Sequence, residues 1–208
     1  MKVAVIGSGI SGLACAHYLS DEHEVWVYEA ARKIGGHTAT VDVKLGTRHY
    51  AIDTGFIVFN DWTYPCFIEL MNELGVSSKP TAMGFSVRDP ETGLEYSGTN
   101  LDTLFAQRRN LVSLPFIGMV RDILRFNREA VVDLDDGKIE DNETLGAYLV
   151  RKGYSEKFKR HYLAAMGSAI WSADCDTILD FPVIFFLRFF RNHGLLSVKD
   201  RPQWRVIE

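Results

Sequence analysis

The sequence predicts an α/β protein in which an incomplete parallel sheet is followed by β-hairpins and a mainly helical second part. Three observations lead to this class. A β-branched strand runs into a glycine-rich turn, a second strand follows after one helix, and the pattern is helical beyond residue 101. The 208 residues are 47% hydrophobic and 24% charged, as in globular proteins that bury a core. We expect two domains, at residues 1–62 and 63–208.

The first strand, at residues 2–6, leads directly into a G-x-G-x-x-G loop at residues 7–12. Residues 13–19 continue as a helix, and a second strand at residues 24–28 ends in Glu29. Glu29 comes 17 residues after the last glycine of the loop, close to the roughly 20 expected for the acidic residue of a dinucleotide fold. The loop alone is a weak signal. With a strand before it, a helix after it and this acid, it indicates a dinucleotide site.

Each part of this unit has a physical role in holding a dinucleotide. Gly7 permits the tight turn, Gly9 lets the backbone approach a pyrophosphate, and Gly12 lets the helix pack closely on the strand. The start of the helix presents unpaired N–H groups and the positive end of its dipole to the phosphates. Glu29 is placed to accept hydrogen bonds from the ribose hydroxyls and would repel a 2′-phosphate, which disfavours NADP.

The residues after Glu29 favour a flavin over a nicotinamide cofactor. Residues 29–37 (EAARKIGGH) resemble the E-x-x-x-x-x-G-G-[R/H] signature of flavin amine oxidases, phytoene desaturases and protoporphyrinogen oxidases. The resemblance implies FAD as the cofactor, held by a Rossmann-like unit at residues 1–62, with a substrate or cap domain at residues 63–208. The cofactor-binding residues that it implies are Gly7, Gly9, Ile10, Ser11, Gly12, Glu29, Lys33, Gly35, Gly36, His37, Thr54, Gly55, Phe56, Ile57 and Val58.

Lys33 and His37 are the two basic residues of this set. Lys33 is expected to neutralise phosphate charge. His37 stands where the family more often has arginine, and a histidine hydrogen-bonded to the backbone of a hairpin is an equally good interpretation.

Two β-hairpins and a series of helices complete the predicted elements. Residues 38–43 and 49–53 flank a turn at residues 44–47, and a second hairpin joins residues 84–89 to residues 94–97. Residues 64–74 have helical periodicity. The helical pattern from residue 101 onward is broken near Pro115, Gly137, Gly153, Pro182 and Gly194. The acidic segment at residues 133–143 predicts a solvated loop.

Two segments of the second part allow two interpretations. Arg121, Arg125 and Arg128 share one stripe of a predicted helix, opposite the apolar residues Ile117, Val120, Leu124 and Val131, and residues 181–190 (FPVIFFLRFF) are densely aromatic. Such a pair of segments is suited to peripheral contact with an anionic membrane or to a lipid-like substrate. The alternative, which we favour, is that the arginines form a solvated face and the phenylalanines line a core.

Nearly the whole chain also resembles a narrower bacterial group of predicted NAD/FAD-binding, amine-oxidase-like proteins. The resemblance implies an FAD-dependent oxidoreductase that accepts a hydride equivalent from an amine or a lipid-like substrate. Two alternatives are a non-catalytic FAD-binding redox module at a membrane surface and an NAD-dependent dehydrogenase. The matching segments are residues 7–12, 35–38, 41–43, 53–65, 169–172, 189–196 and 201–205.

Only two parallel strands are evident, and a doubly wound sheet needs several. We therefore expect this chain to be part of a protein about twice as long, or to need a partner chain that completes the sheet. The lysine that assists flavin amine oxidases lies towards their C-terminus, beyond this chain, and no Ser/His/Asp set or close carboxylate pair stands out. No catalytic residue is assigned.

Composition excludes several other classes. A net charge of −4 gives no reason to expect a nucleic-acid partner. The three cysteines (Cys15, Cys66 and Cys175) are scattered, which argues against disulfides and against a zinc site. Such cysteines fit a reducing compartment, so we expect a cytoplasmic protein, either free or peripherally bound to a membrane. No apolar stretch approaches the roughly 20 residues needed to span a bilayer.

Overall fold

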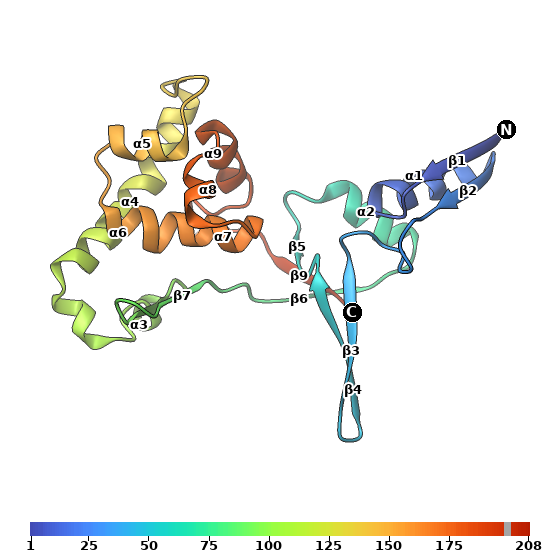
Figure 1. Cartoon of the computed structure of the whole chain (residues 1–208), viewed down its shortest axis with the longest axis horizontal. Helices are drawn as coiled ribbons and strands as arrows, with labels where there is room; N and C mark the ends of the chain where they lie inside the picture. Colours follow the sequence, from blue (N-terminus) through green and yellow to red (C-terminus); the bar gives the residue numbers. More distant parts are fainter. Residues whose placement is uncertain (198–200) are drawn as a thin grey trace. The chain divides into compact units, whose positions relative to one another are not determined.

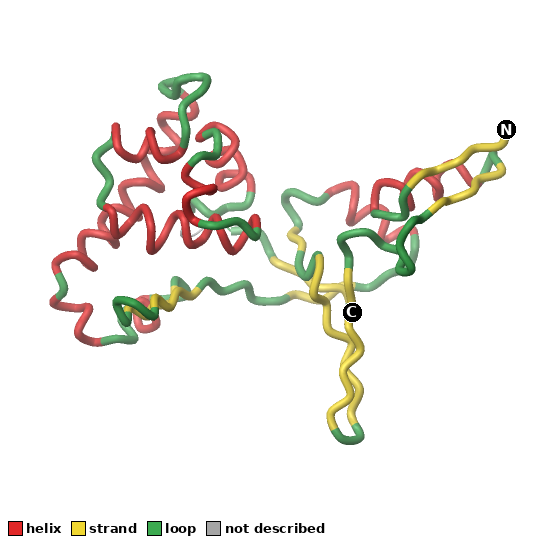
Figure 2. The backbone as a smooth tube through the Cα atoms, in the orientation of Figure 1, coloured by secondary structure: helices red, strands yellow, loops and turns green. Residues whose placement is uncertain are grey.

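The computed structural model describes residues 1–197 and 201–208, and the chain forms two compact units (Figure 1). Unit 1 comprises Met1–Thr81 with Gln203–Glu208, and unit 2 comprises Ala82–Pro202. Helices dominate unit 2, whereas most strands belong to unit 1 (Figure 2). The α/β class is thus confirmed, while the division into cofactor and substrate domains at residue 62 stays a prediction.

Unit 1 begins with the predicted strand, helix and strand. β1 (Lys2–Ile6) pairs in parallel with β2 (Glu24–Tyr28), and α1 (Ile10–Ser20) connects them. β-branched residues suit both strands, and the glycine after Ile6 ends the first one. The register pairs Ile6 with Tyr28, so both strands end at the same edge of the sheet. This edge brings the glycine loop and Glu29 together.

The first hairpin is formed by β3 (Ala39–Leu45) and β4 (Arg48–Gly55). Leu45 pairs with Arg48, so the turn consists of Gly46 and Thr47 alone, and Gly46 has a φ of +61°. The predicted turn at residues 44–47 was too long, because Lys44 and Leu45 belong to the strand and pair with His49 and Arg48. The pairing is irregular between Ala39 and Thr40, at the end of the hairpin nearest the glycine loop.

A three-stranded antiparallel sheet in unit 1 was not predicted. Its order is β5 (Phe59–Asn60), β9 (Trp204–Ile207) and β6 (Ser78–Pro80), and α2 (Pro65–Glu73) follows β5. The Arg205 side chain donates hydrogen bonds to the hydroxyl and the carbonyl of Ser78 at 2.9 and 2.8 Å. The last residues of the chain therefore return to unit 1.

Unit 2 consists of one hairpin followed by helices, as predicted. The hairpin pairs β7 (Ser86–Asp89) with β8 (Leu94–Ser97). The helical elements are α3 (Leu101–Leu104), η1 (Arg108–Val112), α4 (Leu114–Asp135), α5 (Leu145–Arg151), α6 (Glu156–Phe158), η2 (Lys159–Ala164), α7 (Ala165–Trp171), α8 (Cys175–Leu179) and α9 (Val183–Asn192). The structure describes no helix, within residues 1–197 and 201–208, with the length and apolar character needed to cross a membrane.

The core of unit 2 packs α4 against α9 and the short helices, but with a face of α4 that the sequence did not predict. Phe116, Met119, Phe126 and Ala130 are fully buried there. The predicted inner face included Ile117 and Leu124, which are both exposed. They lie four positions before and three after Arg121 and so share its side of the helix, which means that their predicted position opposite the arginines was wrong. The predicted aromatic core is found in α9, where Val183, Phe186, Leu187 and Phe190 are buried.

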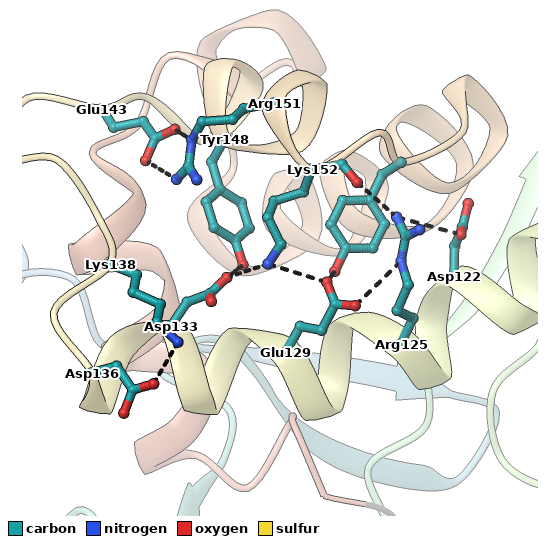
Figure 3. Close-up of polar contacts among 11 residues, drawn as sticks. Asp122, Arg125, Glu129, Asp133, Asp136, Lys138, Glu143, Tyr148, Arg151 and Lys152 are labelled. Carbon is teal, nitrogen blue, oxygen red and sulfur yellow. Dashed lines mark hydrogen bonds and ion pairs between the residues drawn. The ribbon is translucent and has the colours of Figure 1, made fainter.

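The acidic segment at residues 133–143 is not simply a solvated loop. Asp133 lies in α4 and is buried, with one carboxylate oxygen 2.8 Å from Lys152 Nζ and 2.7 Å from the Tyr148 hydroxyl that donates to it (Figure 3). Glu143 accepts two hydrogen bonds of 2.7 Å from Arg151. The carboxylates of Asp133 and Glu143 are therefore paired with Lys152 and Arg151. Pairing offsets the cost of removing a carboxylate from water.

Replacing Thr144 with alanine is expected to lower the free energy of unfolding by about 1 kcal/mol. The Thr144 hydroxyl accepts a hydrogen bond from the Ala147 amide at 3.2 Å and so caps α5. Urea unfolding of the full chain measures the change. Thr144→Ser keeps the hydroxyl and should unfold like the parent. An equal loss in the serine variant would show that the methyl group, not the cap, is responsible.

Candidate dinucleotide-binding site

The glycine loop joins β1 to α1 with geometry that only glycine allows at two positions. Gly7 has a φ of +95°, and its amide donates to the Tyr28 carbonyl at 2.8 Å, which holds the loop against the end of β2. A Cβ on Gly12 would lie 2.0 Å from the Gly7 carbonyl oxygen. Helix α1 therefore packs on the loop more closely than any side chain would permit.

The N-terminus of α1 is open. Gly9 is its N-cap residue, and no side chain among residues 1–197 and 201–208 caps the helix, so the first-turn amides of Ile10, Ser11 and Gly12 have no capping acceptor there. Helix amides without such a partner bind anions such as phosphate. A Cβ on Gly9 would meet only the Gly36 Cα, at 4.0 Å. Gly9 therefore leaves the backbone beside these amides open to a ligand.

The Glu29 carboxylate is directed at the glycine loop. Its Oε2 accepts hydrogen bonds from the Ser8 amide, at 2.9 Å, and from the Ser8 hydroxyl, while its Oε1 accepts from the Ala31 amide at 2.8 Å. These bonds, with the Ala31 amide contributing most, lower the pKa of Glu29 to about 2. A carboxylate that stays ionised in this position is suited to accept hydrogen bonds from ribose hydroxyls.

Ser8 is a site residue that the motif did not identify. It is buried, it anchors Glu29 through two groups, and its carbonyl accepts from the Gly35 amide at 2.9 Å. One residue thus links the glycine loop, the acid of β2 and the glycine pair that follows it. The sequence did contain one sign of its importance, because Ser8 lies between the first two glycines and so at the tip of the turn.

The glycine pair lies against the loop. Gly35 and Gly36 have φ values of +107° and +61°, and a Cβ on Gly36 would lie 2.8 Å from the Gly9 Cα. The two backbones therefore touch, as the resemblance implied for a chain that passes close to the cofactor. Lys33 has another contact in this structure, because its Nζ donates to the Thr40 carbonyl at 3.3 Å.

The end of β4 connects to this arrangement through His37. A Cβ on Gly55 would lie 2.1 Å from the His37 carbonyl oxygen, so the two backbones are in close contact. The Thr54 hydroxyl donates to the Ala39 carbonyl at 3.2 Å. His37 contributes its backbone to this contact, and its side chain is exposed. Its predicted contact with the cofactor stays a prediction.

Phe56, the first of residues 56–58, has a strained backbone conformation. Phe56 has a φ of +54°, which a bulky residue rarely adopts, and its ring packs edge-on against Phe67 at 5.1 Å between centroids. Ile57 is exposed and Val58 is half-buried. Strain of this kind gathers at ligand-binding segments. It is the structural feature that best matches the expected contact of residues 54–58 with the ring system.

The arrangement fits an adenine dinucleotide. Within the described residues, the first-turn amides of α1 have no side-chain cap, Gly9 adds no Cβ over them, and an ionised carboxylate lies at the carboxyl end of the second strand. Contacts among Ser8, Gly9, Glu29, Gly35 and Gly36 bring the three predicted segments together. The binding role of each residue stays a prediction.

Among curated proteins, the chain is 35% identical to 15-cis-phytoene desaturase of Synechococcus elongatus over 80 residues, which are 38% of this chain and 16% of that protein. It is 27% identical over 200 residues to the chloroplastic/chromoplastic zeta-carotene desaturase of Zea mays, covering 86% of this chain and 33% of the relative. The chain thus spans about a third or less of the length of these relatives.

The solved structures that it resembles include two oxidoreductases. A putrescine oxidase variant with redesigned cofactor binding matches with a TM-score of 0.62 at 18% identity, over 99% of this chain and 45% of the other. An oxidoreductase from Methanosarcina mazei matches with a TM-score of 0.58 at 16% identity, over 100% of this chain and 46% of the other. At these identities the likeness establishes the fold, and the chain spans about half of each structure.

The model of one family, described as flavin containing amine oxidoreductase, matches residues 10–197 and thus most of the chain. The match begins within the glycine loop, of which it includes residues 10–12, and it includes Glu29, the glycine pair and unit 2 up to residue 197. The predicted FAD cofactor and the predicted superfamily are confirmed by it. On this match, the chain belongs to the family of flavin-containing amine oxidoreductases.

Proposed function

We propose that the protein to which this chain belongs is an FAD-dependent oxidoreductase that accepts a hydride equivalent from a lipid-like substrate or an amine. The observation that carries the proposal is the Glu29 carboxylate held against the glycine loop by Ser8, beside the open N-terminus of α1. This is the arrangement expected of a site for the adenosine and pyrophosphate of a dinucleotide.

Of the two substrate classes, we place the lipid-like one first. Relatives that match by sequence over 86% of the chain include two zeta-carotene desaturases, whose names describe the desaturation of zeta-carotene. The putrescine oxidase structure that contains bound putrescine is only 20% identical to this chain. Sequence similarity therefore favours removal of two hydrogens from adjacent carbons, with an amine as the second class to be tested.

The residues of this chain act by binding and orientation. When bound, the flavin supplies the atom that accepts the hydride equivalent. We assign the adenosine and pyrophosphate end to the glycine loop and Glu29, and the approach to the ring system to residues 54–58. No residue of this chain is assigned a proton transfer, because no titratable side chain of the site is placed by the described contacts to reach a substrate.

The test uses the full-length protein, purified and examined for bound flavin by its visible absorbance. We expect a flavin spectrum that is bleached under anaerobic conditions by a polyunsaturated or cyclopropane-containing lipid, and less readily by putrescine. A protein that retains flavin but is bleached by no member of either class would be a non-catalytic module, which contradicts the proposed reaction. A protein that binds NAD and no flavin would contradict the cofactor as well.

Replacing Ser8 with alanine is expected to weaken FAD binding by about tenfold, because one hydrogen bond to a charged group is lost while the amide bonds remain. The same loss should raise the pKa of Glu29 from about 2 towards its ordinary value of 4.5. The carboxylate of the parent stays ionised down to low pH. The variant should therefore lose further FAD affinity between about pH 6 and about pH 4, where the parent does not.

Fluorescence titration with FAD at both pH values measures this effect. Ser77→Ala is the matched control, since Ser77 is an exposed serine of unit 1 that belongs neither to the glycine loop nor to the contacts of Glu29. If the two variants bind FAD equally at both pH values, the assigned role of Ser8 is wrong.

A further inference from the structure

One exposed face of α4 combines aliphatic and basic side chains at regular spacing. Leu114, Ile117 and Leu124 remain 81%, 43% and 59% exposed, and Arg121 and Arg128 are exposed among them. Residues that recur every three or four positions lie on one side of a helix. These five residues are called the outer stripe of α4, and together they span about 21 Å along the helix axis.

The outer stripe is presented by a well-anchored helix. The opposite face of α4 is buried in the core of unit 2, where the Phe116 ring packs edge-on against Tyr96 and Phe105 at 5.8 and 5.6 Å between centroids. Exposure of the stripe therefore does not reflect a loosely packed element. The preceding turn, η1, adds Val112, which is 83% exposed, at the same end as Leu114.

Arg125, which the sequence grouped with Arg121 and Arg128, is not part of this face. Its guanidinium lies 4.0 Å from the centroid of the Tyr154 ring and donates to the Lys152 carbonyl at 3.2 Å. Figure 3 shows Arg125 directed towards Lys152 and Asp122. The two remaining arginines have no carboxylate partner among the ion pairs of the described residues.

The charge of this region is opposite to that of the chain. Residues 103–121 include three arginines and no aspartate or glutamate, although the whole chain carries a net charge of −4. One of the three, Arg108, is paired with Asp102 at 2.6 Å, and Arg109 and Arg121 have no such partner among the described ion pairs. Beyond them, Asp122 faces inward and is buried. The exposed surface around the stripe therefore favours an anionic ligand.

We propose that the outer stripe of α4 is a docking surface for an anionic lipid membrane, with the helix lying in the plane of the interface. Leucine and isoleucine side chains enter the boundary of the acyl chains, while the two arginines reach back to the phosphates of the headgroups. A protein segment that covered the stripe would instead bury Arg121 and Arg128 in the contact. Removing these two charges from water costs free energy unless the segment supplies carboxylates to pair with them.

A second copy of the chain fits less well for the same reason, since a contact of the stripe with itself would bring arginines together. The membrane is therefore the occupant that uses both kinds of side chain. The proposal is independent of the proposed oxidoreductase function, because no residue of the outer stripe belongs to the dinucleotide-binding site.

The test is co-sedimentation of the full-length flavoprotein with vesicles made either of equal parts phosphatidylcholine and phosphatidylglycerol or of phosphatidylcholine alone. The parent should bind the anionic vesicles, and binding should weaken at high salt. Two double variants, Leu114→Ser with Leu124→Ser and Arg121→Gln with Arg128→Gln, should each bind about tenfold more weakly.

Two controls make single substitutions of the same kind elsewhere in unit 2, and each is compared with the single substitutions of the stripe. Val150→Ser in α5 removes an aliphatic side chain that is 65% exposed, and Arg188→Gln in α9 removes an exposed arginine. Both should bind like the parent, and flavin absorbance and circular dichroism should be unchanged in all variants.

The proposal is overturned if the parent does not bind anionic vesicles, if it binds phosphatidylcholine equally well, or if the controls weaken binding as much as the stripe variants. If a double variant does not fold, its two single substitutions are tested instead, and each must weaken vesicle binding more than its control does. A parent protein that carries no flavin but binds anionic vesicles would contradict the proposed function and leave the docking surface standing.

Discussion

Replacing Gly12 with alanine should abolish flavin retention, so that the purified full-length variant is colourless. The added Cβ would lie 2.0 Å from the Gly7 carbonyl oxygen and 3.1 Å from the Gly7 carbonyl carbon. Both atoms are backbone, and neither can move aside as a flexible side chain would. Helix α1 must then shift away from the loop, and its first-turn amides shift with it. An overpacking cost of about 3 kcal/mol corresponds to about 100-fold in affinity.

Two companion variants separate this steric effect from a general intolerance of alanine. Gly118→Ala, in the helical segment of α4, meets no atom within 4 Å and should keep flavin bound and the fold at least as stable as in the parent. Gly9→Ala meets only the Gly36 Cα at 4.0 Å, so the fold should persist while the Cβ blocks the expected pyrophosphate. Should Gly12→Ala bind FAD as tightly as Gly118→Ala, the glycine loop is not the cofactor site.

The elements that the sequence predicted well are those specified by short-range signals. Both parallel strands were predicted with the bounds that the structure has, because a β-branched run and a following glycine or acid mark each one. The hairpins were predicted from turn residues such as Gly46 and Gly93, both at positive φ. In each case the information lies within about ten residues.

The sheet formed by β5, β9 and β6 depends instead on pairing across more than 120 positions, as between Ser78 and Ile207. Strands of two and three residues carry almost no pattern of their own, although residues 204–207 (WRVI) have high β-propensity. The importance of Ser8 was missed for a related reason. Its hydroxyl acquires a role only once the fold brings Glu29 to the loop.

The rotation of α4 was predicted wrongly because the helix carries two apolar stripes. One includes Phe116 and Met119, and the other includes Ile117 and Leu124. Periodicity alone cannot choose between them, and the larger aromatic residues of the first stripe fill the space against Tyr96 and Phe105. The exposed stripe is then available for contact outside the unit.

A second large effect is expected at Lys152, the cation shared by two acids of α4. Its Nζ lies 2.8 Å from Asp133 Oδ2 and 3.3 Å from Glu129 Oε2, and the Tyr148 hydroxyl donates to the same Asp133 oxygen at 2.7 Å (Figure 3). Burial alone would raise the pKa of Asp133. The hydrogen bonds from Lys152 and Tyr148 and the positive charge of Lys152 outweigh burial, so that the pKa lies below its ordinary value.

Replacing Lys152 with methionine should lower the free energy of unfolding by about 3 kcal/mol at neutral pH, because a buried carboxylate loses its cation and faces a second carboxylate. The lowered pKa of Asp133 in the parent stabilises the fold above the unfolded value of 3.8, and this contribution is lost as the pH falls through the folded pKa. Without Lys152 the pKa of Asp133 should rise above its ordinary value. The variant's deficit should then shrink as the pH is lowered towards about 4, where Asp133 becomes protonated.

Urea unfolding followed by circular dichroism, at neutral pH and at about pH 4, measures the deficit directly. Lys138→Met is the matched control, since that lysine pairs with the exposed Asp136 at 2.7 Å and its loss should leave stability unchanged. Adding Asp133→Asn to Lys152→Met should recover part of the loss, because the unpaired charge is then removed. A deficit that is independent of pH, or that Asp133→Asn deepens, would mean that the lysine acts through the packing of its stem and not through its charge.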